Sequence, residues 1–316
     1  MKLCRYSLTP LSPWSGWLRS DTIYGLICWN MAESEGEAAC ASLIEAFGAN
    51  QPPFLLSSAM PAGYLPMPIL PAPSREKFRG LAAGDDGSGE KLFAALKRFK
   101  KFRKSKWLAA SAWQRHKAGL DLARLFLDSP EAAAKPLSET AFEPHVAIDR
   151  ATGAARAGQL FFTRLRYFQP EAKLDLYARC EDPDWLLKKL RLIGDTGFGQ
   201  NASTGNGRFD AELDGDFDAE AFELPEASAC LLCSACAAPD MTGLDGYYRV
   251  EVKRAKTGPG NANPFKKPFL MLEEGSVLTR RLPGPFVLRD LNADRRVVQI
   301  MQPLTLPCRL AEARKS

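Results

Sequence analysis

Gly194-Asp-Thr-Gly-Phe-Gly-Gln-Asn-Ala-Ser-Thr-Gly-Asn-Gly207 is the stretch that decides how this chain of 316 residues is expected to fold. Five of its fourteen residues are glycine, so the backbone can approach another surface closely and offer N–H groups to phosphate oxygens. A helical pattern precedes it, and the strand-like segment Arg208 to Leu213 follows. Phosphate-binding and dinucleotide-binding loops have the opposite order, strand then helix, and no Gly-Lys-Ser or Gly-Lys-Thr occurs here. The stretch is therefore either a long surface turn or a cradle for a nucleic-acid backbone.

The segments around this glycine loop predict an α+β unit. Lys2 to Leu8 alternates like a strand, and Ser20 or Asp21 is expected to cap a helix that continues in a second helical repeat. A short helix should start at Asp182-Pro183 and end near Ile193, directly before the loop. Three further strands are expected at Pro144 to Asp149, Leu160 to Tyr167 and Lys173 to Arg179. Strand, helix, two strands, helix, loop and strand is the order of a ferredoxin-like βαββαβ unit.

Two segments interrupt this order. The proline-rich stretch Gln51 to Pro73 allows only edge strands and extended turns. Residues 74–141 are interpreted as an insertion, in which Gly84 to Gly89 is a flexible break before a basic helix near Lys91. In that helix an apolar stripe is expected, formed by Leu92, Leu96, Phe99 and Phe102. The predicted domains are thus 1–214, carrying the insertion, and a mostly β domain at 215–316.

Composition limits the class of protein. With 46% hydrophobic and 25% charged residues the chain is globular, and its apolar runs fall well short of the ~20 residues that span a bilayer. No signal peptide is expected, and the eight dispersed cysteines are typical of reduced thiols in a cytoplasmic protein without structural disulfides. The net charge of +5 conceals segregation: Lys91 to Lys117 holds ten basic residues and no acidic ones, and Phe209 to Glu226 holds eight acidic residues and no basic ones. Such blocks indicate partners.

A tandem cysteine motif offers one metal hypothesis. Cys230, Cys233 and Cys236 have two CxxC spacings that would suit a zinc or iron–sulfur site. The alternation across Ala229 to Ala237 also fits a buried strand, and no fourth ligand is evident nearby. The buried strand is the favoured interpretation, and no cofactor is expected.

Six sequence blocks resemble the fourth subunit of the type III-A CRISPR effector, the Csm complex. They are Leu8-Thr-Pro-Leu-Ser-Pro-Trp14, Leu18-Arg-Ser-Asp-Thr-Ile-Tyr-Gly-Leu-Ile-Cys-Trp29, Pro53-Phe-Leu-Leu-Ser-Ser-Ala-Met-Pro-Ala-Gly-Tyr-Leu-Pro66, Val146-Ala-Ile-Asp-Arg-Ala-Thr-Gly153, Gly197-Phe-Gly-Gln-Asn-Ala-Ser-Thr-Gly-Asn-Gly-Arg-Phe209 and Pro264-Phe-Lys-Lys-Pro-Phe-Leu-Met-Leu-Glu-Glu-Gly-Ser-Val277. The resemblance runs from about residue 3 to about residue 310 and is weakest in the basic insertion and the acidic run.

The resemblance implies a RAMP-superfamily protein with two ferredoxin-like (RRM-like) modules, the second degenerate and mostly β. It implies a non-catalytic subunit that binds the repeat-derived 5′ handle of the crRNA. The expected protein partners are a large polymerase-like subunit and the first backbone RAMP subunit, with target RNA contacted only indirectly and no membrane. The basic run Lys97 to Lys106 is left open between RNA, a neighbouring subunit and plain solvent.

The expected RNA-binding residues follow from the resemblance and from the chemistry of single-stranded RNA, which is gripped through phosphates and stacked bases. The loop and its end would line the handle, and the first helix would offer its positive end, although plain N-capping by Ser20 and Asp21 is an equal alternative. A basic group that includes Lys266-Lys267 and a histidine before the Val146 block complete the set. The predicted residues are Ser12, Arg19, Ser20, Thr22, His145, Gly197, Gly199, Ser203, Thr204, Gly205, Gly207, Arg208, Arg254 and Lys256.

The alternative function is a metal-independent RAMP endoribonuclease that processes precursor crRNA through attack by a 2′-hydroxyl. That chemistry favours a histidine or similar base beside the scissile phosphate and cations that stabilise charge. The sequence has only His116 and His145, and neither stands in a pattern that demands catalysis. We therefore expect no enzymatic activity.

Overall fold

Strand β1 (Lys2–Pro10) is the centre of the main sheet of the computed structural model, which describes residues 1–82, 89–128, 137–238, 241–258, 261, 263–280, 282 and 284–311. It pairs antiparallel with β8 (Leu174–Cys180) on one side and β9 (Phe209–Leu213) on the other. On its outer side β8 pairs with β2 (Phe54–Leu56) and β3 (Met60–Pro61). The strand order is β2-β8-β1-β9. The proline-rich stretch thus supplies an edge strand, as predicted.

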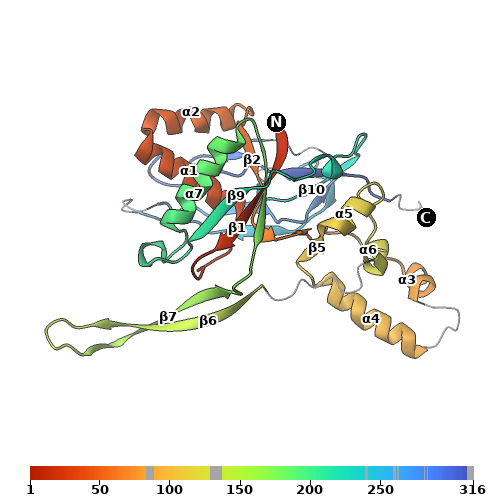
Figure 1. Cartoon of the computed structure of the whole chain (residues 1–316), viewed down its shortest axis with the longest axis horizontal. Coiled ribbons are helices and arrows are strands. Elements are labelled where there is room, and N and C mark those ends of the chain that lie inside the picture. The colour runs from red at the N-terminus through yellow and green to blue at the C-terminus, as the bar shows by residue number, and fades with distance from the viewer. Residues whose placement is uncertain are drawn as a thin grey trace.

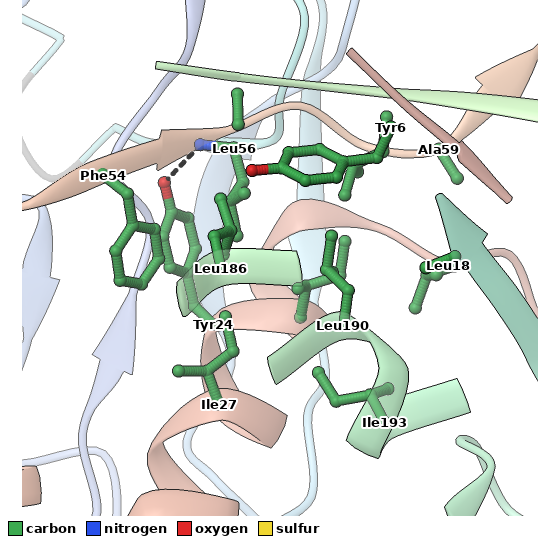
Figure 2. Close-up of a cluster of buried hydrophobic side chains, with 14 of the residues drawn as sticks. Tyr6, Leu18, Tyr24, Ile27, Phe54, Leu56, Ala59, Leu186, Leu190 and Ile193 are labelled. Atoms are coloured by element: carbon green, nitrogen blue, oxygen red, sulfur yellow. Dashed lines mark hydrogen bonds between the residues drawn. The ribbon is translucent and has the colours of Figure 1, made fainter. Parts of the chain in front are cut away.

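Helices cover one face of this sheet (Figure 1). They are α1 (Ser20–Ser34), α2 (Glu37–Gly48) and α7 (Pro183–Thr196). Since β1 alternates, Cys4, Tyr6 and Leu8 point to the helices and Leu3 to the other side. Figure 2 shows the resulting core, to which α1 contributes Ile27 and α7 contributes Leu190. Burial of these side chains is what fixes both helices on the same face.

The C-terminal strands and the insertion cover the opposite face. Leu3 and Tyr177 pack there with Leu231 of β10 (Ala229–Leu232), Leu306 of β18 (Thr305–Cys308) and Trp113 of the insertion. From residue 215 onward the described residues form strands and one 3-10 turn at Glu220–Phe222 but no α-helix, which agrees with the mostly β prediction. The other strands are β11 (Cys236–Ala237), β12 (Gly246–Tyr247), β13 (Val250–Lys253), β14 (Phe269–Leu272), β15 (Val277–Leu278), β16 (Val287–Leu288) and β17 (Gln299–Ile300).

The insertion is a small helical group. It comprises α3 (Arg75–Ala82), α4 (Gly89–Arg103), β5 (Trp107–Ala109), α5 (Ala110–His116) and α6 (Leu122–Asp128), and β5 pairs with β4 (Tyr64–Pro66). Of the predicted stripe on α4, Phe99 and Phe102 are buried, whereas Leu96 is exposed. The side chain of Leu92 lies outside the described residues, as does the break at Gly84 to Gly89 apart from the start of α4.

The strands predicted at Pro144 to Asp149 and Leu160 to Tyr167 are present, but they do not belong to the main sheet as the ferredoxin-like order implied. They are β6 (Ser138–Ile148) and β7 (Ala155–Phe168), which pair along their length with each other and are joined to the body by a bridge between Arg166 of β7 and Trp14. They form a long hairpin that projects from the body (Figure 1). The reason is that alternation identifies a strand but not its partner, and the turn between them pairs the two strands locally. The second strand of the main sheet is instead the three-residue β2.

The state of the cysteines and the composition of the helices bear on the expectations of reduced thiols and of no membrane span. All eight cysteines lie in the described ranges and are free thiols. None of the helices in those ranges combines the length and the apolar composition that crossing a bilayer requires.

Candidate nucleic-acid interface

The glycine loop is held against the segment that follows β1. The amides of Gly207 and Arg208 donate to Pro13 O at 2.8 Å and to Ser12 Oγ at 2.9 Å. At the other end of the loop, the amide of Gln200 donates to Ser15 Oγ at 3.1 Å. Ser12, one of the predicted RNA-binding residues, therefore accepts a hydrogen bond from the loop through its hydroxyl oxygen. The same contact brings Ser12 and Arg208 together.

Two glycines of this loop differ in what surrounds them. Gly207 has a φ of +80°, and a Cβ there would lie 2.1 Å from the carbonyl oxygen of Phe198. Gly205 has a φ of +89°, but a Cβ there would meet no atom within 4 Å. Gly207 is thus required by close packing between the two arms of the loop, whereas Gly205 stands at an open, exposed tip.

An aromatic cluster fixes the base of the loop. The buried ring of Trp14 contacts Phe198 and Phe168 edge to face, with ring centroids 4.8 Å and 4.7 Å apart. Phe209, at the start of β9, packs in the same cluster. The base is therefore rigid, while Ser203, Thr204, Gly205 and Arg208 are exposed.

Most of the loop's amides already have partners. Gly205 donates to Ala202 O at 2.9 Å and Asn206 to Asn201 O at 3.2 Å, in addition to the three contacts with Ser12, Pro13 and Ser15. The glycine content suggested that the backbone N–H groups of the loop are free to bind phosphate. Most of them instead donate hydrogen bonds within the protein. Its exposed chemistry is the Ser203 and Thr204 tip and the guanidinium of Arg208.

The start of α1 differs from the prediction. Ser20 and Asp21 do not cap the helix: its N-cap residue is Arg19, whose own side chain accepts no capping hydrogen bond. The amide of Ser20 donates to Ser58 Oγ at 3.0 Å, and Ser58 Oγ donates to Glu274 Oε1 at 2.6 Å. The Glu274 carboxylate, reached through Ser58, is thus the anion beside this helix start. Thr22 is half-buried in the first turn, where its amide donates to Arg19 O.

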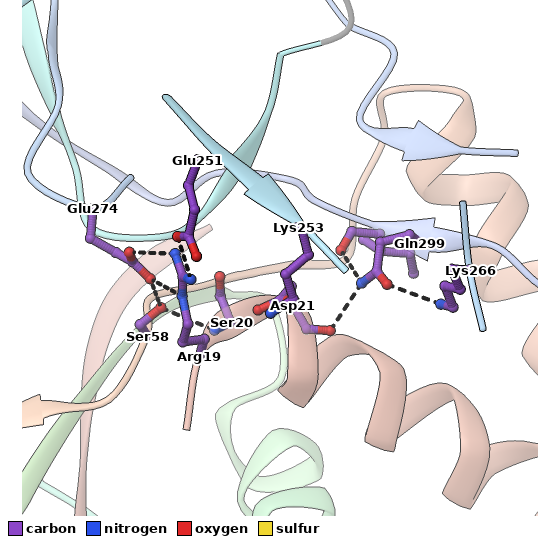
Figure 3. A network of polar contacts seen from close by, with 10 residues as sticks. Arg19, Ser20, Asp21, Ser58, Glu251, Lys253, Lys266, Glu274 and Gln299 are labelled. Atoms are coloured by element: carbon purple, nitrogen blue, oxygen red, sulfur yellow. Dashed lines mark hydrogen bonds and ion pairs between the residues drawn. The ribbon is translucent and has the colours of Figure 1, made fainter. Parts of the chain in front are cut away.

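Arg19 belongs to an ion-pair network between the first helix and the C-terminal strands (Figure 3). Its Nε and Nη2 donate to the two Glu274 oxygens at 3.0 and 2.8 Å, and its Nη1 donates to Glu251 Oε2 at 3.0 Å. Burial opposes the charge of Arg19, but Glu274 and Asp21 outweigh this and raise its pKa. Arg19 therefore connects the start of α1 with β13 and with the turn after β14 through its ion pairs.

The network continues through Asp21 to two lysines. Lys253 Nζ lies 2.8 Å from Asp21 Oδ2, and Gln299 Nε2 donates to the Asp21 carbonyl at 3.2 Å. Lys266 Nζ donates at 2.9 Å to both Gln299 Oε1 and Val298 O (Figure 3). Lys266, predicted within a second basic group, is thus half-buried at the contact between α1 and the C-terminal strands.

The burial of Lys266 makes the stability of the folded chain depend on pH. Burial lowers the pKa of Lys266 to about 8, and the Asp21 carboxylate offsets this only in part. In the unfolded chain the pKa returns to about 10.4. Between these two values the unfolded state binds the extra proton, so stability rises with pH. We expect wild type to gain about 2 kcal/mol relative to Lys266→Met from about pH 7.5 to about pH 9.5. Urea unfolding at both pH values measures this, and parallel pH profiles would contradict it.

The remaining predicted RNA-binding residues lie on other elements. His145 is on β6 and stacks on Phe161 of β7, with ring centroids 5.2 Å apart. Arg254 is exposed just after β13, and Lys256 Nζ lies 5.1 Å over the ring of Phe265. Gly197 ends α7, and Gly199 faces Ser15.

The three clustered cysteines diverge. Cys233 is buried with the core over the β1 face that Leu3 occupies, while Cys236 belongs to a separate C-terminal cluster against which Cys230 packs. Burial raises the pKa of all three thiols, which opposes thiolate formation. Among the residues that the structure describes, no group of three metal-ligand side chains comes together.

Sequence reasoning missed two residues, Trp17 and Arg166. The Arg166 guanidinium lies over the Trp17 ring, with Cζ 5.2 Å from the centroid, and the pair borders a cleft of about 1120 Å³. Trp17 follows β1 and Arg166 lies near the end of β7, at the root of the hairpin. No spacing pattern in the sequence joins positions so far apart.

Comparison with known proteins gives a consistent result at the level of structure. No family model and no curated protein matches the sequence. Among solved structures, a chain of a Csm1-Csm4 cassette in complex with cA4 matches at 18% identity with a TM-score of 0.60, over 98% of this chain and 100% of the other. A second Csm1-Csm4 cassette, in complex with pppApA, matches at 17% identity and 0.59 over 99% and 100%. The Csm3-Csm4 subcomplex of the type III-A CRISPR-Cas interference complex matches at 18% and 0.59 over 97% and 99%.

Csm4 is the component that these assemblies share. The chain has a Csm4-like fold. The match spans nearly the whole of both chains, so the insertion, the hairpin and the C-terminal strands all fall within the Csm4-like fold. The resemblance that the sequence blocks predicted is confirmed at the level of the fold.

Proposed function

We propose that this chain is the Csm4-type, RNA-binding subunit of a type III-A CRISPR interference complex. It binds the 5′ handle of the crRNA and bridges a large polymerase-like subunit to the first backbone subunit. The observation that carries the proposal is the end-to-end structural match to chains solved in Csm1-Csm4 and Csm3-Csm4 assemblies. The order of β1, α1, β2, β8, α7 and β9 supports a first module of ferredoxin-like type, followed by a degenerate, mostly β second module.

Exposed apolar side chains support membership of an assembly. Phe142, Phe161 and Phe162 on the projecting hairpin are each more than half exposed. Rings that remain in water on a two-stranded ribbon are typical of a surface that a partner covers. A subunit that bridges two others needs such surfaces.

The exposed tip of the glycine loop supports handle binding. Ser203, Thr204 and Gly205 stand beside the exposed Arg208 on a base that Trp14 and Ser12 hold rigid. Hydroxyls and a guanidinium are donors for phosphate oxygens, and a tip without bulky side chains permits close approach.

The test uses two nearly isosteric substitutions at Gly205. Both Asn and Asp tolerate a positive φ better than other residues, and a side chain there meets no neighbour, so either variant should fold. Gly205→Asp puts a negative charge where a phosphate is expected and should weaken binding of labelled crRNA by about 1 to 2 kcal/mol, or about 5- to 30-fold. Gly205→Asn should weaken binding far less. Equal affinities of the two variants for crRNA would show that no phosphate binds at this tip.

The same assay addresses catalysis. We propose that the chain cuts no RNA, because His145 is stacked on Phe161 with its Nε2 4.0 Å from Glu143 Oε2, and His116 Nε2 is bonded to Asp128. Neither arrangement provides a base next to several cations. Incubated RNA should therefore remain full length on a denaturing gel. A cut product that disappears with His145→Ala would instead establish the RAMP endoribonuclease.

A further inference from the structure

A cleft and a smaller hollow meet next to the glycine loop. The cleft of about 1120 Å³ is lined by the end of α4, the proline-rich segment and the turns around β13 and β14. The hollow of about 230 Å³ contains Ser15, whose hydroxyl holds the Gln200 amide of the loop. Trp17 and Arg166 line both spaces. A chain that leaves the loop at Ser15 can therefore pass Trp17 and Arg166 into the larger cleft.

Arg166 is a half-buried cation without an anion. Its Nη1 donates to Ser138 Oγ at 3.0 Å, but its buried Nε has no partner. Burial and then the neighbouring Arg164 lower the pKa of Arg166, and no carboxylate among the described residues pairs with it to offset them. An arginine in such a place is usually paired with a carboxylate or phosphate. The Arg166 guanidinium could therefore pair with one negative group of a bound ligand.

The cleft has the charge and the rings that suit a polynucleotide. Four further cations line it, and its acidic residues are partly neutralised, because Glu251 and Glu274 are already paired with Arg19 and only Glu273 remains. The rings of Trp17 and Trp107 lie 5.7 Å apart on one wall, and Tyr248 also lines the cleft. Stacking rings next to cations are the elements from which sites for single-stranded RNA are built. The additional cations are Arg103, Lys104, Lys106 and Arg249.

We propose that single-stranded RNA continues from the glycine loop into this cleft, with a phosphate on Arg166 and bases against Trp17 and Trp107. This inference rests on the proposed function, because it extends the path of the same strand. It assigns the basic end of α4 to RNA. A protein segment without an acidic side chain would fill the apolar wall but would leave the Arg166 guanidinium without an anion.

The experiment measures fluorescence anisotropy of the full chain with 3′-fluorescein-labelled dodecauridine over a range of salt concentrations. Arg166→Gln should weaken binding about 5- to 10-fold and reduce the slope of log K against log salt by about 0.7, the value for one phosphate contact in a single strand. Lys104→Gln with Lys106→Gln, both exposed in the segment just after α4, should reduce the slope by about 1.4. Arg296→Gln removes the same charge from an exposed site outside the cleft and should change neither quantity.

The outcomes separate this inference from the proposed function. A wild-type chain that binds neither this RNA nor crRNA contradicts both. If Gly205→Asp weakens binding but Arg166→Gln and the Lys104/Lys106 variant match Arg296→Gln, the handle stays on the loop and the cleft path is wrong. The cleft path is also wrong if Arg166→Gln retains RNA and instead releases a protein subunit on co-purification, since the cleft is then a protein interface. Thermal melting confirms that each variant is folded.

Discussion

Gly207→Ala is expected to destabilise the folded chain by about 3 to 5 kcal/mol, among the larger effects of a single methyl group. The positive φ of Gly207 alone costs an alanine roughly 1 to 2 kcal/mol. The new Cβ would also lie 2.1 Å from Phe198 O and 2.5 Å from Phe198 N, so the backbone must move. That movement breaks the hydrogen bond of the Gly207 amide to Pro13 and loosens the contact of Arg208 with Ser12.

Gly205→Ala is the matched control for this substitution. It has a similar φ in the same loop but no atom within 4 Å of the added Cβ, so only the backbone strain of about 1 to 2 kcal/mol should appear. Urea unfolding of both variants measures the difference. Equal losses of stability would mean that the two arms of the loop are not packed as described.

Arg19→Met should cost about 2 to 4 kcal/mol, because it leaves the Glu274 carboxylate without its guanidinium in a place where water reaches it poorly. The side chains of Arg19 and Glu274 are only 18% and 20% exposed, and Ser58 Oγ and the amide of Ser20 depend on the same geometry. The loss should appear as a lower urea midpoint. It should also weaken the contact between α1 and the C-terminal strands.

Two further variants give this prediction its control. Arg289→Met breaks a pair with Glu45 in which the side chains are 48% and 72% exposed, and it should cost less than about 1 kcal/mol. Arg19→Met combined with Glu274→Leu removes both charges and should recover much of the loss, since an apolar pair can replace a buried ion pair. A double variant as unstable as Arg19→Met alone would show that the guanidinium acts through some contact other than Glu274.

The sequence was sufficient where local pattern and burial agree. Alternation in β1 and helical spacing in α1 and α7 predicted the centre of the main sheet and one layer of helices. Helix α7 starts at Asp182-Pro183 as expected, and the structure adds that Asp182 is its cap. The proline-rich stretch was expected to allow edge strands, but the pairing of β2 with β8 was not predicted, because a strand of three residues carries almost no periodic signal. The β6–β7 hairpin was misplaced because alternation does not name the partner of a strand.

The sequence predicted those parts of the candidate site that lie within its motifs, but not the contacts that only the fold creates. The contact of Ser12 with Arg208 joins two motifs that the sequence blocks had already singled out. Arg19 was predicted to contact RNA, but its ion pairs with Glu251 and Glu274 depend on strands over 200 residues away in sequence, as the separations of 232 and 255 positions show. Trp17 and Arg166 are brought together only by the fold, so neither motif nor charge run could reveal them.

The root of the hairpin has a mechanical consequence. Trp14 exchanges two backbone hydrogen bonds with Arg166 of β7, at 3.0 and 2.9 Å, and the same Trp14 ring supports Phe198 beneath the glycine loop. The hairpin projects from the body (Figure 1), and Trp14 is hydrogen-bonded to it at its root. Because Trp14 contacts both the hairpin root and the base of the loop, we expect a molecule that displaces the hairpin to disturb the loop as well.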